Sequence, residues 1–197
     1  MRVYLLGTLL ILWGCAEPQT LAGGTAPGPR SDPAYVADTE CATCHADEAR
    51  SWEGSHHDLA MQEASEATVI GDFDDATFGE GDDATRFFRR GDRFLIQTAG
   101  LDGKRAMFEV PYVFGVAPLQ QLLVALPGGR LQAFPIAWDA RPEEAGGQRW
   151  FHLTPEDVPG PGDPFHWTGV YQTWNHQCAS CHSTALQRGF DEATDTY

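Results

Sequence analysis

The sequence predicts an α+β domain that is rich in short helices and loops and carries a small inserted antiparallel β-sheet at about residues 86–138. Three observations lead to this fold class. Polar and small residues with scattered apolar ones fill residues 38–63, as expected of two short helices. Apolar runs separated by the turn sequences "RGD", "LDGK" and "PGG" follow over 86–138, which is typical of four or five antiparallel strands. An irregular stretch rich in Trp, His and Pro then covers residues 149–184.

Residues 1–15, which read MRVYLLGTLLILWGC, resemble a lipoprotein-type signal peptide. Arg2 forms a short positive region, and the apolar segment after it is shorter than the roughly 20 residues that a membrane-spanning helix needs. The ending LWGC predicts that Cys15 is lipidated and becomes the new N-terminus, with plain cleavage further along as the alternative. Ala16 after this cysteine favours sorting to the outer membrane. The sequence therefore predicts an exported, periplasmic protein with a lipid anchor in the outer membrane.

A tether and one domain follow the signal. Residues 16–34 are rich in Pro, Gly and Ala without apolar periodicity, so a disordered tether is expected there. Residues 35–197 are then the folded domain, which is long enough to bury an ordinary core. The formal net charge of −15 argues against nucleic-acid binding, because contacts with phosphates need a concentrated basic surface.

Two five-residue motifs carry the chemistry of the sequence. The chain reads CATCH at 41–45 and CASCH at 178–182, and both have the CxxCH form of a c-type haem attachment site. The two thiols of such a motif lie about one helical turn apart and can add to the two vinyl groups on one porphyrin edge, so that the adjacent His becomes the proximal iron ligand. The sequence thus predicts two covalently attached haem c groups in a helical and loop-rich haem domain. The predicted haem-binding residues are Cys41, Cys44, His45, Cys178, Cys181 and His182.

Two other kinds of site use CxxC pairs. Two pairs can form a four-thiolate zinc site, and one pair can act as a redox dithiol. Neither requires His directly after the second Cys, and His makes up 7 of the 197 residues. Chance would therefore place His after both pairs only about once in a thousand sequences. Assigning Cys15 to a lipid leaves four of the five cysteines, all in the two motifs, so haem attachment accounts for every cysteine.

Each iron also needs, or deliberately lacks, a ligand on its distal side. His56 and His57 follow the first motif closely enough for a helix and turn to place one of them over a porphyrin. His176 lies too close to the second motif to reach round its own haem, although it could serve another. Met61 and Met107 are the available thioethers, but bis-His ligation is favoured because a Met is more often part of the core. The candidate distal ligands are His57, His56, His166 and His152.

The irregular stretch at residues 149–184 needs something to order it, and a large apolar cofactor would do so. Aromatic side chains are the natural packing partners of a porphyrin, with ordinary core packing as the alternative. The candidates for such packing are Trp52, Trp138, Trp150, Trp167 and Trp174.

The stretch ECATCHADEARSWEGSHHDLAM at residues 40–61 resembles the multihaem c-type cytochromes of the cytochrome c-554 type, in which CxxCH is followed by Trp and then by a SxH element. That element is Ser55-His56-His57 here, and the resemblance favours His57 as a distal ligand. Residues 35–190 as a whole resemble a bacterial branch of these cytochromes that often carries C-terminal tetratricopeptide repeats. Relatives of this kind usually have a further CxxCH, so the resemblance implies a truncated chain with more haem motifs beyond it.

Three functions are compatible with these features. The favoured one is an electron carrier whose haems pass single electrons between periplasmic redox partner proteins. The second is an enzyme of the nitrite or hydroxylamine oxidoreductase type, which would need one haem without a distal His. The third is a haem-based binding or sensor module. The available histidines can occupy both irons, and this favours the electron carrier over the enzyme.

Overall fold

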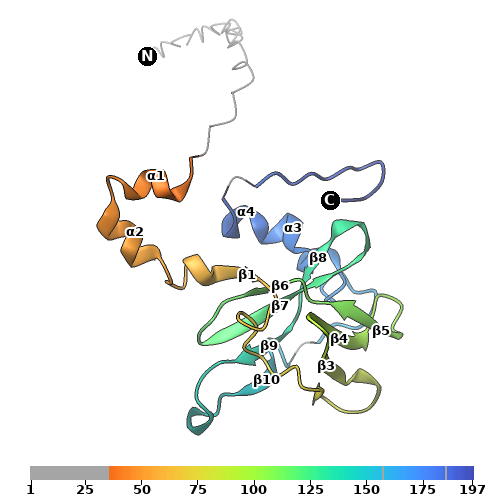
Figure 1. Cartoon of the computed structure of the whole chain (residues 1–197). Coiled ribbons are helices and arrows are strands. Elements are labelled where there is room, and N and C mark those ends of the chain that lie inside the picture. Colours follow the sequence, from red (N-terminus) through yellow and green to blue (C-terminus); the bar gives the residue numbers. More distant parts are fainter. Residues whose placement is uncertain (1–35, 157, 185) are drawn as a thin grey trace, which may run out of the picture. The chain divides into compact units, whose positions relative to one another are not determined.

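Antiparallel β-structure dominates the computed structural model of the chain (Figure 1). In the part of the chain that the structure describes, ten strands occur between Met61 and His152 in two sheets, together with four short α-helices. The predicted helical and loop-rich domain with a small inserted sheet is therefore wrong, because the sheets make up the bulk of the domain. The strands also extend beyond the expected segment at 86–138, on both sides.

The structure describes residues 36–156, 158–184 and 186–197. The signal peptide predicted at 1–15, the lipidation site predicted at Cys15 and the tether predicted at 16–34 lie outside these ranges. Within them, every helix is too short and too polar to cross a lipid bilayer. Residues 36–197 form one compact unit.

The smaller sheet has four strands in the order β2-β3-β4-β5. Its first strand lies within the acidic stretch at residues 71–85. The RGD sequence forms a tight hairpin turn, as predicted, since Arg90 pairs with Arg93 and Gly91 has a φ of 59°. The strands are β2 (Ala76–Phe78), β3 (Thr85–Arg90), β4 (Arg93–Ala99) and β5 (Arg105–Glu109).

The larger sheet has six strands in the order β1-β6-β7-β9-β10, and β8 pairs with β7 beside this path. Its edge strand β1 joins the segment after the first CxxCH motif to the sheet, with Met61 opposite Phe114. The strands are β1 (Met61–Glu63), β6 (Tyr112–Phe114), β7 (Leu119–Ala125), β8 (Leu131–Ala133), β9 (Ile136–Asp139) and β10 (Arg149–His152).

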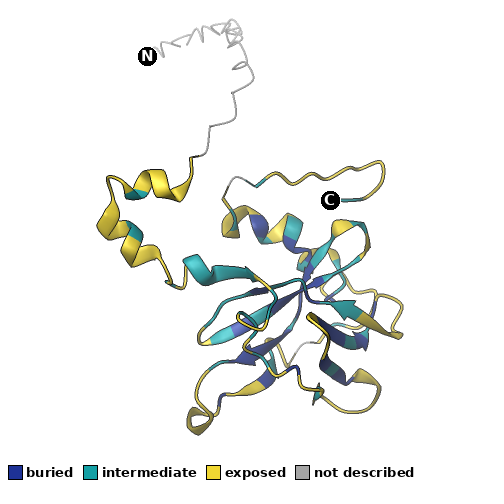
Figure 2. Cartoon of the chain, in the orientation of Figure 1, coloured by how far each residue is buried: buried dark blue, intermediate teal, exposed yellow. Residues whose placement is uncertain are grey.

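The α-helices lie near the two ends of the compact unit and carry the two CxxCH motifs. Helices α1 and α2 contain no buried residue, as Figure 2 shows by their yellow surface. They are α1 (Asp38–Ala42), α2 (Ala46–Trp52), α3 (Trp174–Gln177) and α4 (Ala179–His182). Short 3-10 helices occupy the connections: η1 (Asp58–Ala60), η2 (Gly81–Asp83), η3 (Pro127–Gly129), η4 (Glu143–Ala145) and η5 (Val170–Gln172).

The main core is aromatic and is shared by the two sheets. Phe87 of β3 stacks on Trp150 of β10 with ring centroids 3.8 Å apart, and Phe73 packs edge-on against both rings. Such aromatic pairs stabilise a core by about 0.5–1.5 kcal/mol beyond the area that they bury. The sheets are therefore held together by protein side chains, with Trp138 and Trp167 in the same cluster.

The irregular stretch after β10 is ordered by the polypeptide itself. Trp167 donates its indole N–H to the carbonyl of Ala99 at 2.8 Å, and buried Gln132 donates to the carbonyls of Trp167 and Gly169. Trp138, Trp150 and Trp167 are thus core residues, which is the alternative to packing on a porphyrin. Trp52 is 47% exposed, and Trp174 is buried against the second motif.

Candidate functional site

The first CxxCH motif forms a helical turn between α1 and α2. The backbone N–H groups of Cys44 and His45 both donate to the carbonyl of Cys41, at 3.2 and 3.0 Å. Residues three and four positions apart on such a turn lie on the same side, so both thiols and the imidazole share one face. All three side chains are exposed, and both thiols are free.

The second motif, at the start of and within α4, has the same pattern of backbone hydrogen bonds. The N–H groups of Cys181 and His182 both donate to the carbonyl of Cys178 at 3.1 Å. Cys178 is half-buried, and burial raises the pKa of its thiol, with the neighbouring Cys181 adding to the effect. Ala179 is fully buried, which anchors this motif to the protein more firmly than the first.

The donor set of each motif fits a covalently attached haem. Two free thiols separated by one helical turn match the two vinyl groups of one porphyrin edge, and the His at the next position could bind the iron of that haem. The residues that could hold these groups are Cys41, Cys44 and His45 at one motif and Cys178, Cys181 and His182 at the other. Among the described residues, no three or more His, Cys, Asp or Glu side chains converge as a metal-binding group, so the four cysteines do not form one four-thiolate cluster.

His56 and His57 lie in the turn between α2 and η1, and both are exposed. This turn is held by local polar contacts. Asp58 accepts the N–H of Gly54 at 2.8 Å through its carboxylate, and its own N–H donates to the hydroxyl of Ser55 at 3.3 Å. The segment that carries the two histidines therefore has a defined backbone close in sequence to the first motif.

His152 and His166 lie together elsewhere, in a cleft of about 750 Å³. Thr85 and Thr98 of the four-stranded sheet also line this cleft, whereas no residue of either CxxCH motif does. Burial lowers the pKa of both histidines, so both imidazoles are neutral at pH 7. These two candidate ligands therefore line the same cleft, and that cleft does not include either CxxCH motif.

Local polar contacts engage the Nδ1 atom of both rings. The Nδ1 atom of His152 accepts the N–H of Thr154 at 3.1 Å. Nδ1 of His166 accepts the N–H of Thr168 at 3.3 Å and lies 2.8 Å from the Thr168 hydroxyl, where the donor depends on the tautomer of the ring. Both rings are therefore held by neighbours within this cleft.

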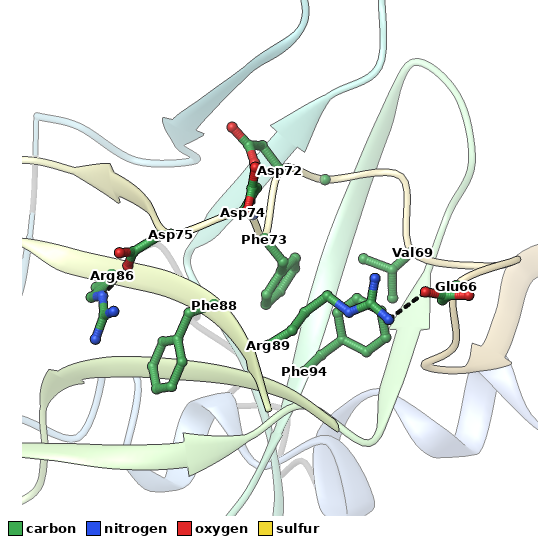
Figure 3. A pocket seen from close by; sticks show the side chains of 11 residues that line it. Glu66, Val69, Asp72, Phe73, Asp74, Asp75, Arg86, Phe88, Arg89 and Phe94 are labelled. Atoms are coloured by element: carbon green, nitrogen blue, oxygen red, sulfur yellow. Dashed lines mark hydrogen bonds and ion pairs between the residues drawn. The ribbon is translucent and has the colours of Figure 1, made fainter. Parts of the chain in front are cut away.

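A second cleft holds a charged lining that the sequence analysis did not single out. It measures about 690 Å³ and is lined by four acidic side chains from residues 66–75 and by Arg86 and Arg89 of β3. Figure 3 shows that Arg89 reaches Glu66, at 2.5 Å, while Arg86 pairs with Asp75. Phe73, from the acidic stretch, points into the core beneath them. Both arginines that line this cleft are therefore paired with carboxylates. Among the described residues, the lining offers no unpaired cationic side chain to a ligand.

Comparison with known proteins bears on the first motif. Residues 40–76 match the family model described as "Cytochrome c554 and c-prime". The match begins directly before Cys41 and ends at Ala76, the first residue of β2, so the second motif lies outside it. No curated protein and no solved structure matches the chain. The matched segment supports a c-type cytochrome with covalently attached haem, as the resemblance at residues 40–61 implied.

Proposed function

We propose that this protein is an electron-transferring c-type cytochrome that carries one haem at each CxxCH motif. The observation that supports this most is the hydrogen-bond pattern that the two motifs share, in which the N–H groups of the second Cys and the His, at positions i+3 and i+4, both donate to the carbonyl of the first Cys. The family match at residues 40–76 supports the first of them independently. In this proposal, two Cys of each motif hold the porphyrin, and His45 and His182 bind iron.

The protein's contribution is to attach, orient and tune these groups. A bound haem supplies reversible one-electron chemistry, whose potential depends on axial ligands, burial and hydrogen bonding. All three side chains of the first motif that would hold a haem are exposed. A haem at this exposed position suits direct electron exchange with another protein. We assign His57 as the distal ligand at this motif, with His56 as the alternative, because the Ser55–Asp58 turn holds both close by in the chain.

The proposal extends to the place of action. The signal-like residues 1–15 and Cys15 favour export to the periplasm and a lipid anchor in the outer membrane. Covalent haem attachment is completed outside the cytoplasm, which is consistent with export. The partners are then periplasmic redox proteins, and the net charge of −15 favours partners with a basic surface. The likeness to the multihaem cytochromes with tetratricopeptide repeats is part of the same proposal.

Optical spectroscopy tests the assignment as a carrier. The chain is expressed with a cytochrome c maturation system and measured in its oxidised and reduced forms. We expect low-spin bands that neither carbon monoxide nor nitrite changes, because both irons carry two protein ligands. A high-spin haem that binds either molecule would contradict the carrier and support the enzyme or the sensor module.

A further inference from the structure

One face of the six-stranded sheet lies beneath α3 and α4 rather than against the main core. Along β7, Leu122 and Val124 point into the main core, whereas Leu123 between them joins a second cluster with Trp174 of α3. Met61 of β1 also packs against this second cluster. The alternation of a strand therefore places Met61 on the face that carries the second CxxCH motif.

The polypeptide covers this face only in part. Trp174 and Ala179 are buried, but Cys178 is half-buried in the same cluster. The sheet residues that remain half-buried beside them are Met61, Tyr112, Phe114 and Leu131. This apolar and partly exposed face lies next to Cys178. A porphyrin joined to the Cys178 thiol must stay near that thiol, so the haem is the group expected to cover the face.

The iron ligands available on this face are few. Among the described residues of the second cluster, Met61 and Tyr112 are the side chains besides Cys178 with an atom that binds haem iron in known proteins. Met61 is favoured of the two, because Met is the partner of His in cytochromes c, whereas Tyr is the ligand of catalases.

The candidate histidines lie outside this cluster: His56 and His57 occupy the exposed turn before β1 and are assigned to the first motif, and the others line two clefts. His152 and His166 share the cleft beside Thr85, and His176 lines a different cleft of about 750 Å³ with Arg130 and Tyr197.

The backbone around Met61 is fixed on both sides. Met61 pairs with Phe114 across β1 and β6, the N–H of Gly115 donates to the carbonyl of Ala60 at 2.9 Å, and the N–H of Ala64 donates to Pro111 at 2.8 Å. A residue held at the edge of a sheet in this way keeps its side chain on one face. The flexible thioether can then adapt to a group bound beside it.

We infer that Met61, through its Sδ atom, is the distal axial ligand of the haem attached at Cys178 and Cys181, opposite His182. This inference rests on the proposed function. It gives the two motifs different ligand sets, His/His at the first and His/Met at the second. Since Met ligation raises the reduction potential of a haem relative to His ligation, the second haem has the higher potential.

The experiment compares Met61→Leu and Met61→His with Met107→Leu in the haem-loaded full chain. Leu matches Met in volume, so packing against Tyr112 and Phe114 is preserved. Met107 is the matched control, since it lies on β5 of the other sheet and is 51% exposed. Haem count and far-UV circular dichroism establish that each variant is loaded and folded.

We expect the oxidised wild type to show the far-red absorption band of a sulfur–iron bond. Both Met61 variants lose this band, and Met107→Leu retains it. Met61→Leu also gives a high-spin signal from one haem, and Met61→His lowers the potential of that haem. A wild type with two covalent haems and no such band, or a band that survives in Met61→Leu, overturns the inference and leaves the proposed function intact. A chain that acquires no covalent haem contradicts the proposed function itself.

Discussion

At the scale of single residues, the buried carboxylate of Asp139 is stabilised by hydrogen bonds from a neighbouring arginine. This carboxylate at the end of β9 is 4% exposed and accepts two hydrogen bonds from the guanidinium of Arg141, at 2.9 and 2.6 Å, and one from its backbone N–H at 3.1 Å. The Arg141 hydrogen bonds lower the pKa of Asp139 from 3.8 to about 2, against the opposing effect of burial. The ionised form is therefore the one that stabilises the fold.

Replacing this carboxylate gives a pH-dependent loss of stability. Because the folded pKa lies below the unfolded value, the contribution of Asp139 is complete above about pH 4 and disappears as the pH falls towards 2. We expect Asp139→Asn to lower the denaturant midpoint at pH 7, with a difference from wild type that narrows below pH 4. Asp102→Asn, whose partner Lys104 is exposed, serves as the control with a smaller effect. A difference that does not change with pH would contradict this account.

His57 and His56 provide a second test at this scale. We expect His57→Ala in the haem-loaded protein to convert one haem from low spin to high spin, because the iron loses its distal ligand. His56→Ala is the control, since the same turn of backbone carries it in an equally exposed position. Electronic absorption of the oxidised protein distinguishes the two. An unchanged spectrum in His57→Ala would remove this residue as a ligand.

At the scale of elements, the turn between β9 and β10 depends on a glycine. A Cβ atom at Gly147 would lie 2.0 Å from the carbonyl oxygen of Arg141, which is backbone and cannot rotate away. We expect Gly147→Ala to lower the free energy of unfolding by about 1–3 kcal/mol, because the turn must shift to relieve the overlap. Gly160→Ala is the control, since nothing lies within 4 Å of its Cβ position. Equal melting temperatures for the two variants would refute this.

The sequence pattern predicts some elements and not others for a physical reason. The hairpin at Gly91 and the helical turns of the CxxCH motifs are local, so turn residues and spacing identify them. Strands β1, β2 and β10 are only three or four residues long and are stabilised by distant partners, which leaves no periodicity to detect. The sequence pattern does not identify Phe73 as a core residue either, because this side chain stands between two aspartates and belongs to no periodic apolar run.

At the scale of the whole molecule, the main core contains no residue of either CxxCH motif. In the segment after β10, Trp167 and Gln132 supply order through hydrogen bonds to backbone carbonyls, so part of this segment is positioned by the polypeptide. Of the candidate site, residue types and spacing predict the two motifs. Residue types and spacing do not predict which distant side chains come close to the motifs, as the positions of His152, His166 and Met61 demonstrate.

The sheets should therefore fold without haem. We expect a variant with Ser in place of all four motif cysteines to keep the far-UV circular dichroism of the sheets and to unfold cooperatively, because the Phe87–Trp150 core is unchanged. Phe87→Ala in the same background should lower the free energy of unfolding by about 3–5 kcal/mol, the usual result of removing a buried aromatic side chain. A disordered four-serine variant would show that haem, rather than this core, organises the domain. The four substitutions are Cys41→Ser, Cys44→Ser, Cys178→Ser and Cys181→Ser.

Covalent haem at both motifs is the central claim, and the intact mass of the matured protein tests it most directly. The mass is measured for the wild type and for the variants Cys41→Ser/Cys44→Ser and Cys178→Ser/Cys181→Ser, alongside the pyridine haemochrome spectrum. We expect two haems in the wild type and one in each variant, because each pair of thiols binds its own porphyrin. A wild type with fewer than two haems, or a variant that keeps the haem count of the wild type, would contradict the account.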